Sequence, residues 1–182
     1  GGQLGMMITE AAKNLSDAIS EITVLDPTDN CPAAQAGAKQ IVGDFKDEDA
    51  IVKLAEQSDI ITYEIESGNT DVLSKLNAEI EPSPTTLGII QDKLLQKKFL
   101  SENELPVSQF YEITSLDDLR EKINDLGLPV LLKARRDAYD GRGNFKITSP
   151  DEIEKAYQHF DGKSLMVEKF VNFKMEVSVI AA

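Results

Sequence analysis

Residues 1–26 read GGQLGMMITEAAKNLSDAISEITVLD, which is a glycine turn, a helical pattern and a short β-branched run. Between positions 4 and 19 the apolar residues recur at near-helical spacing, and residues 22–25 are typical of a strand. The alternation continues with strand-like residues 40–42 and 59–63 and with helical patterns over residues 47–57 and 69–77. This order predicts a Rossmann-like α/β domain with a parallel sheet covered on both faces.

Two prolines in Glu81-Pro82-Ser83-Pro84 interrupt the pattern, because proline is excluded from helix interiors and central strands. We therefore expect a first domain over residues 1–84 and a second over residues 85–182. The second has a lysine-rich helix over 92–103 and an amphipathic helix over 115–126 with Ser115 as its N-cap. Strands are expected near residues 109–112, 129–133, 144–147, 165–170 and 175–180. This half is predicted to be α+β and antiparallel.

The composition excludes several kinds of protein. Of the 182 residues 41% are apolar, and no apolar run approaches the roughly 20 residues of a membrane span, so no membrane partner is expected. The formal charge of −13 repels polyphosphate backbones, which argues against nucleic acid, although a few lysines can still bind a small phosphorylated ligand. The single cysteine, Cys31, cannot form an internal disulfide, and the cytoplasm is the expected compartment. Both ends suggest a fragment, since Gly1 opens on a turn and residues 177–180 read as an unfinished strand.

Two features of the first half are candidate ligand contacts. The glycines of Gly1-Gly2-Gln3-Leu4-Gly5 let the backbone approach a phosphate at a helix N-terminus, and Asp26 ends the next strand, where dinucleotide folds place a ribose-binding carboxylate. The full dinucleotide fingerprint is absent, so a tight turn at the glycines and a strand-ending turn at Asp26 remain alternatives. Glu64 and Glu66 follow a strand at the sheet edge where open α/β folds bind ligands.

The stretch KARRDAYDGRGN, residues 133–144, is the sharpest feature of the second half. Lys133 leaves an apolar strand and is followed by a polar loop with two glycines, which could fold over a triphosphate. A basic hairpin turn with solvated arginines is the alternative. Further along, Glu168 lies in an apolar run, residues 165–171, whose backbone could pair with an adenine as an edge strand. The carboxylates of Glu168 and Glu176 could accept the ribose hydroxyls, and the alternative is that both lie on a solvated strand face.

Lys93 is a further candidate contact for a phosphate, whereas the remaining polar residues point to no chemistry. Lys93 and Lys97 stand at i and i+4 of the helix over 92–103, where like charges repel unless an anion joins them; a solvated helix face is the alternative. His159 reads as a surface or capping residue, and Cys31 has no activating neighbour in sequence. We find no metal-ligand cluster and no serine–histidine pair, so triad chemistry is disfavoured.

A set of short motifs runs through the chain in one order: GGQLG (1–5), LDP (25–27), PAAQ (32–35), TYEIE (62–66), QDKLLQKKFL (91–100), LPV (105–107), LKARR (132–136), YDGRGN (139–144) and VEKFV (167–171). In these motifs the chain resembles the N5-carboxyaminoimidazole ribonucleotide synthetases, ATP-grasp ligases of purine biosynthesis. YDGRGN with the preceding lysine is the most specific part. The resemblance implies a pre-ATP-grasp domain followed by an incomplete ATP-grasp domain.

The resemblance also implies a reaction and a set of site residues. Bicarbonate would be joined to the amine of 5-aminoimidazole ribonucleotide while ATP becomes ADP and phosphate, through carboxyphosphate, which a closing loop would shield from water. The implied ATP contacts are Lys93, Lys133, Ala138, Tyr139, Asp140, Gly141, Arg142, Gly143, Asn144, Glu168, Lys169, Phe170, Val171 and Glu176. The implied catalytic residues are Tyr139, Asp140 and Arg142, and the implied contacts of the ribonucleotide are Gln3, Leu4 and Glu64.

The chain departs from the family pattern in two respects. Asp137-Ala138 stands where the family usually has two glycines, which restricts the loop and puts an acid beside phosphates. The acidic residues that hold Mg²⁺ in the family are expected beyond residue 182, so the fragment alone is expected to be inactive, and no metal ligand is predicted within it. The full-length protein is expected to be a homodimer.

Three alternatives remain from the sequence. Another ATP-grasp ligase or carboxylase would take a different acceptor, although YDGRGN argues against it. An NAD-dependent oxidoreductase would explain GGQLG and Asp26 but not the lysines and loop of the second half. A noncatalytic nucleotide-binding fragment is compatible with the resemblance.

Overall fold

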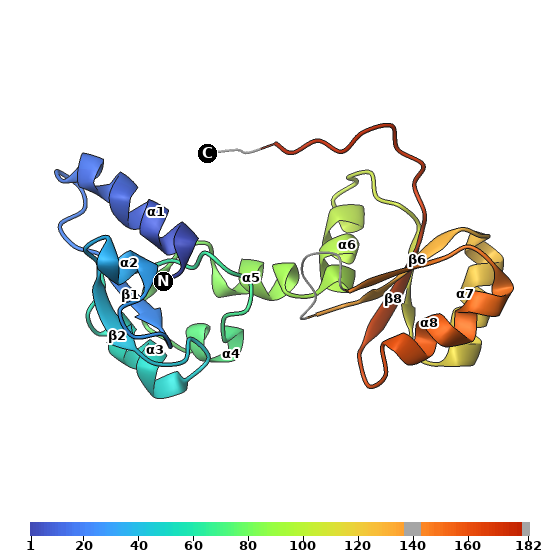
Figure 1. Ribbon diagram of the computed structural model, residues 1–182, viewed down its shortest axis with the longest axis horizontal. Coiled ribbons are helices and arrows are strands. Elements are labelled where there is room, and N and C mark those ends of the chain that lie inside the picture. Colours follow the sequence, from blue (N-terminus) through green and yellow to red (C-terminus); the bar gives the residue numbers. More distant parts are fainter. Residues whose placement is uncertain (137–142, 180–182) are drawn as a thin grey trace. The chain divides into compact units, whose positions relative to one another are not determined.

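The computed structural model describes residues 1–136 and 143–179, which form parts of two compact units, Gly1–Ile90 and Gln91–Ala182 (Figure 1). The first unit extends past the boundary expected after Pro84, because helix α5 (Pro84–Ile90) belongs to it. Pro84 is the first residue of α5, where its missing N–H would have no helical partner in any case. Each unit has its own core and is described separately.

The first unit alternates helices and strands, as predicted. Its elements are α1 (Gln3–Ala12), the 3₁₀ turn η1 (Lys13–Leu15), β1 (Thr23–Asp26), α2 (Pro32–Gln35), β2 (Lys39–Val42), α3 (Glu48–Ala55), β3 (Ile60–Ile61), α4 (Thr70–Leu73), β4 (Glu79–Ile80) and α5. β1 pairs with β2 and β3 pairs with β4, both in parallel, so the parallel sheet is confirmed, but as two two-stranded pieces. The first helix is shorter than the predicted span and ends at Ala12.

Two apolar clusters lie on the strands of the first unit. Ile22 and Val24 pack with Ala33 of α2, while Leu25 and Ile61 pack with Ile51 of α3. Neighbouring residues of β1 thus point to opposite sides, as strand geometry requires. Helices therefore cover both sides of these strands.

The second unit is built on a four-stranded antiparallel sheet of order β5-β8-β6-β7, as its α+β pattern predicted. Its elements are α6 (Lys93–Glu102), β5 (Phe110–Ile113), α7 (Leu116–Leu126), β6 (Val130–Ala134), β7 (Asn144–Ile147), η2 (Pro150–Glu152), α8 (Ile153–His159) and β8 (Leu165–Lys169). The strand predicted near 175–180 is wrong for its described part: residues 175–179 are exposed and belong to no strand. An apolar run forms a strand only where a neighbouring edge can accept its backbone.

Helices α7 and α8 cover one face of this sheet (Figure 1). Val130, Leu132 and Ala134 of β6 point into that core, and so do Leu165 and Val167 of β8. The residues between them point to the other face. Lys133 of β6 and Glu168 of β8 therefore lie on the same side of the sheet, opposite α7 and α8.

The cap of α7 gives a test of this unit. The Ser115 hydroxyl accepts a hydrogen bond from the Asp118 N–H at 3.1 Å, as the predicted N-cap should. Ser115→Ala should lower the free energy of unfolding by about 1 kcal/mol, because that N–H loses its partner. Urea unfolding followed by circular dichroism measures the change. Ser101→Ala, at an exposed position inside α6, should change the free energy of unfolding by about 0.5 kcal/mol at most. Equal effects of the two substitutions would mean that the Ser115 cap does not stabilise the unit.

Candidate functional site

Glu168 is the centre of a buried polar cluster on the α6 side of the sheet. Its side chain is only 7% exposed. Lys97 Nζ of α6 lies 2.6 Å from one carboxylate oxygen, Ser108 Oγ donates to the same oxygen at 2.9 Å, and Lys133 Nζ of β6 pairs with the other oxygen. Lys97 also donates to Ser108 at 2.8 Å. We call these four residues the lysine–glutamate cluster; they come from three elements and one connecting segment.

The electrostatics of this cluster keep Glu168 ionised. Burial by itself would raise the pKa of the Glu168 carboxyl, but the hydrogen bonds and charges of Lys133 and Lys97, together with the Ser108 hydroxyl, outweigh it and lower that pKa. With two lysines and one carboxylate, the cluster carries a net positive charge. That surplus suits an anionic ligand near Lys133, which is 20% exposed.

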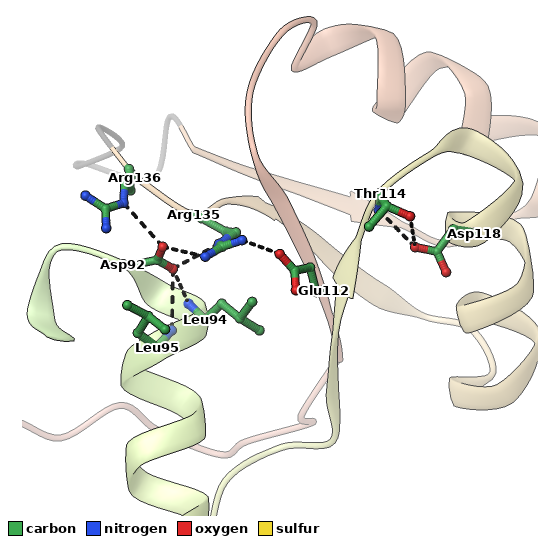
Figure 2. A network of polar contacts seen from close by, with 8 residues as sticks. All are labelled: Asp92, Leu94, Leu95, Glu112, Thr114, Asp118, Arg135 and Arg136. Atoms are coloured by element: carbon green, nitrogen blue, oxygen red, sulfur yellow. Dashed lines mark hydrogen bonds and ion pairs between the residues drawn. The ribbon is translucent and has the colours of Figure 1, made fainter. Parts of the chain in front are cut away.

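Asp92 organises a second polar group, shown in Figure 2, at the N-terminus of α6. Its carboxylate accepts from the backbone N–H of Leu94 at 3.0 Å and caps the helix. The same carboxylate accepts from Arg135 Nε at 3.0 Å and Nη2 at 2.6 Å, and from Arg136 Nε at 3.2 Å. Arg135 reaches Glu112 of β5 at 2.5 Å as well.

These contacts fasten the start of α6 to the end of β6. The Lys93 N–H donates to the Arg135 carbonyl at 2.9 Å, so backbone and side-chain bonds join the same two segments. Lys93, the first residue of α6, therefore lies beside residues 135 and 136, which follow strand β6. Sequence reasoning assigned no role to Asp92 and treated the arginines as solvated in one alternative. An aspartate just before a helix was the available signal.

Acid should weaken the second unit. Burial would raise the pKa of Asp92, but the hydrogen bonds and charge of Arg135, the Leu94 N–H and Arg136 lower it. The pKa of Glu168 is lowered too. A carboxylate with a depressed folded-state pKa contributes stability that is complete above its unfolded pKa, about 4, and is lost as pH falls through the folded value.

We therefore expect the urea midpoint to be level from about pH 7 to 5 and to fall steeply below about pH 4. Unfolding of the chain at a series of pH values measures this. Glu168→Gln removes one titrating group and should flatten the acid limb relative to the parent chain. An unchanged limb in this variant would contradict the contribution of Glu168.

The structure brings some predicted site residues together and separates others. Lys133 and Glu168 meet directly, and Asn144 lies opposite Lys133 in the β6–β7 pairing. Gly143 accepts the Ala134 N–H at 2.9 Å and closes that pairing. Ala138, Tyr139, Asp140, Gly141 and Arg142 lie outside the described residues. Lys97 forms an ion pair with Glu168, a partner that the sequence did not suggest.

The residues after Glu168 point elsewhere. Lys169 Nζ turns to the Gly127 carbonyl at 2.9 Å, and the Phe170 ring lies under Lys146 Nζ at 3.7 Å from its centroid. Val171 and Glu176 belong to the exposed segment 171–179, apart from the lysine–glutamate cluster. The strand that carries Glu168 is no sheet edge, because β8 pairs with β5 on one side and with β6 on the other.

In the first unit, Gln3, Leu4 and Glu64 line one cavity of about 500 Å³. The Glu64 carboxylate lies 3.0 Å from the Gly1 nitrogen, and Asp26 Oδ2 lies 3.3 Å from it. Asp26 also accepts the Thr28 N–H at 2.8 Å, so the strand-ending turn weighed for this residue is present.

The glycine turn approaches this acidic end because it has no side chains. A Cβ on Gly1 would come within 2.7 Å of Cys31 Sγ, and a Cβ on Gly5 within 3.1 Å of Glu64 Oε1. Close packing explains these two glycines without a bound phosphate. Within residues 1–136 and 143–179 no group of three or more His, Cys, Asp or Glu could hold a metal ion, and no helix there is long and apolar enough to cross a membrane.

Comparisons with known proteins cover nearly the whole chain. Residues 1–91 match the ribonucleotide synthetase preATP-grasp domain, and residues 98–182 match the ATP-grasp domain. Phosphoribosylaminoimidazole carboxylase of Schizosaccharomyces pombe is 40% identical over 99% of this chain and 33% of its own length.

Two solved structures from Aspergillus clavatus are also similar. Carboxyaminoimidazole ribonucleotide synthase complexed with ATP has a TM-score of 0.87 at 38% identity, over 96% of this chain and 46% of that one. N5-carboxyaminoimidazole synthase in complex with ADP and 5-aminoimidazole ribonucleotide has the same TM-score at 35% identity and the same coverage. The chain therefore spans about a third to a half of the relatives that it matches.

Proposed function

Because the chain belongs to the ribonucleotide synthetase family, with a preATP-grasp domain followed by an ATP-grasp domain, we propose that its whole protein carboxylates 5-aminoimidazole ribonucleotide. Bicarbonate is the carbon source, and ATP is converted to ADP and phosphate as N5-carboxyaminoimidazole ribonucleotide forms. Relatives solved with ATP, and with ADP and the ribonucleotide, support this assignment. The preATP-grasp domain corresponds to the first unit, residues 1–90, and the ATP-grasp part to the second, residues 91–182.

The observation that carries the proposal is the meeting of Lys133 and Glu168 on adjacent strands. Lys133 is held by β6 and aimed by Glu168, so its ammonium is positioned before a nucleotide arrives. In our proposal Lys133 and Lys93 bind phosphate oxygens, and residues 138–144 close over them. The backbone of residues 168–171 pairs with adenine, and Glu176 accepts the ribose hydroxyls.

We also assign residues to the acceptor side of the reaction. Gln3, Leu4 and Glu64 contact the ribonucleotide. The Gln3 carboxamide oxygen and the Glu64 carboxylate can accept hydrogen bonds from its hydroxyl and amine groups. Tyr139, Asp140 and Arg142 act beside the reacting groups. Closing the loop over the site excludes water from a reactive mixed anhydride and holds the amine close to the electrophilic carbon.

Three finer features belong to the same proposal. Mg²⁺ would be held by acidic residues in the part of the whole protein that this chain does not span, and it would supply positive charge to stabilise the transferred phosphoryl group. The whole protein is a homodimer. It works in the cytoplasm.

Phosphate release by the whole protein tests the function. Purified protein is supplied with ATP, Mg²⁺ and bicarbonate, with and without 5-aminoimidazole ribonucleotide. Release that depends on the ribonucleotide, with a carboxylated product detected by mass spectrometry, is expected. Release that ignores the ribonucleotide, or that responds to another amine acceptor, would overturn the choice of substrate while leaving the nucleotide site intact.

A further inference from the structure

Asp92 is connected to both lysines that we assign to the phosphates. On one side it directly precedes Lys93, the first residue of α6. On the other side its carboxylate binds Arg135, which stands two residues after Lys133 where the chain leaves β6. The distance between the two lysines therefore depends on how firmly the start of α6 and the end of β6 are held together.

Side-chain and backbone bonds join these two elements around Lys93. Asp92 Oδ1 accepts from the Leu94 N–H and from Arg135 Nε, both at 3.0 Å, and Asp92 Oδ2 accepts from Arg135 Nη2 at 2.6 Å (Figure 2). The Lys93 N–H donates to the Arg135 carbonyl at 2.9 Å. The backbone of Lys93 is thus fixed by the helix cap and by the strand end together.

The group is rigid enough to fix a position. Asp92 is 2% exposed, and the Arg135 side chain is 17% exposed. Two parallel bonds from a guanidinium to one carboxylate restrict the orientation of both groups. Arg135 also donates from Nη1 to Glu112 of β5, so the far edge of the guanidinium is held as well (Figure 2).

The two lysines are positioned by different means. The ammonium of Lys133 is held by Glu168 across the sheet. For Lys93 the printed contact is made by its backbone, so the place from which its side chain extends is set by the contacts of Asp92 and Arg135. Binding groups have to be held close to their productive geometry by the residues behind them, and Asp92 meets this requirement for Lys93.

We propose that Asp92 is a positioning residue for nucleotide binding, which sets the distance between Lys93 and Lys133 so that both ammonium groups reach one polyphosphate. The inference rests on the proposed function, because that function assigns both lysines to the phosphates. Asp92 itself does not touch the nucleotide, since both of its oxygens already accept N–H groups and its charge repels phosphate.

Loss of the Asp92 charge has two effects of opposite sign. Asp92→Asn removes a negative charge beside the anionic ligand and loosens Arg136, whose Nε lies 3.2 Å from Oδ2; both changes attract phosphate. If charge alone mattered, the variant would bind ATP more tightly than the parent protein. Loss of positioning weakens binding instead, because Arg135 no longer has an ionic partner at the start of α6. The sign of the change therefore distinguishes the two effects.

Titration calorimetry of the whole protein with ATP, and with adenosine in competition with ATP, measures the effect. Both ligands carry the base and the sugar, so a change confined to ATP reports on the phosphates. Asp92→Asn should weaken ATP binding by about 3- to 10-fold, the equivalent of one hydrogen bond, and adenosine binding by less than about twofold. Tighter or unchanged binding of ATP would overturn the proposal, and so would an equal loss for both ligands.

Ile123→Val is the control for a general loss of stability. Ile123 is buried in the core beneath α7, on the face of the sheet opposite α6. Its truncation should lower the thermal midpoint while ATP affinity stays within about twofold of the parent value, because the lysines keep their places. A loss of ATP affinity in this variant as large as in Asp92→Asn would mean that weaker binding follows from lower stability and that Asp92 has no positioning role.

Lys93→Ala, alone and combined with Asp92→Asn, shows whether the aspartate acts through this lysine. Alone it should weaken ATP binding about 10-fold or more, and the second change should then add less than about twofold. If Lys93→Ala has no effect, the lysine has no place in the proposed function and Asp92 does not position it. If it has an effect but the two changes are additive, the positioning role alone is overturned and the nucleotide site of the proposed function remains.

Discussion

Asp92→Ala should lower the free energy of unfolding of the second unit by about 2 to 4 kcal/mol. Asp92 is 2% exposed and caps α6 while it accepts bonds from Arg135 and Arg136. Loss of an N-cap costs about 1 kcal/mol, and loss of a charged hydrogen bond about 1.5 to 3. Arg135 keeps Glu112 as a partner, so its charge is not left without compensation and the larger penalty of an unpaired buried charge is avoided.

A conservative variant separates the cap from the charge. Asp92→Asn keeps a side-chain oxygen that can accept the Leu94 N–H but removes the negative charge. It should recover about 1 kcal/mol of what the alanine variant loses. Urea denaturation of each variant gives the values.

The matched control is Asp117→Ala. Asp117 also lies in the first turn of a helix and pairs with an arginine, but its side chain is 92% exposed. Its loss should cost at most about 1 kcal/mol, since exposed ion pairs contribute little. If Asp92→Ala were no more harmful than this control, the contacts between α6 and the end of β6 would not stabilise the unit.

Local sequence signals predicted the framework of both units. Ser115, Asp47 and Asn69 each begin a predicted helical pattern, and in the structure each accepts a backbone N–H as the N-cap of its helix, although only Ser115 was predicted to do so. The apolar run before Lys133 predicted the strand β6, but the side of the sheet on which Lys133 lies became clear only from the structure. Helix caps and strands depend on residues close to one another in the chain, which is why they can be predicted from a single sequence.

Contacts between distant residues could not be predicted in the same way. Arg135 is 43 residues from Asp92, and Lys97 meets Glu168 only because α6 covers the face of the sheet on which β8 presents it. The sequence around a charged residue does not indicate which oppositely charged residue will pair with it. The residues 175–179 are the reverse case, because their apolar pattern resembles a strand but no neighbouring edge pairs with them.

Local propensity did not indicate which strands of the first unit pair with one another either. The pattern predicted strands and a parallel sheet, and the described strands form such a sheet in two pieces. How strands are ordered within a sheet depends on tertiary packing, and the sequence pattern carried no information on it. The short elements α2 and β4 were missed for a related reason, because four or two residues are too few to show a period.

Lys133→Ala should weaken binding of ATP or ADP to the whole protein by about 10- to 150-fold, which corresponds to a loss of 1.5 to 3 kcal/mol from one charged hydrogen bond. Lys133 is 20% exposed, so its ammonium can reach a bound anion while Glu168 holds it in position. Isothermal titration with each nucleotide measures the change. Under the proposed function, phosphate release that depends on the ribonucleotide should fall as well.

Lys97→Ala is the control that gives this result its meaning. Both variants remove one lysine partner of Glu168, so both disturb the lysine–glutamate cluster, but only Lys133 is proposed to touch the phosphates. Lys97→Ala should therefore lower the thermal midpoint to a similar degree and weaken nucleotide binding far less. If the two variants lose nucleotide affinity equally, Lys133 acts through Glu168 and the packing around it, and direct binding of a phosphate by Lys133 is ruled out.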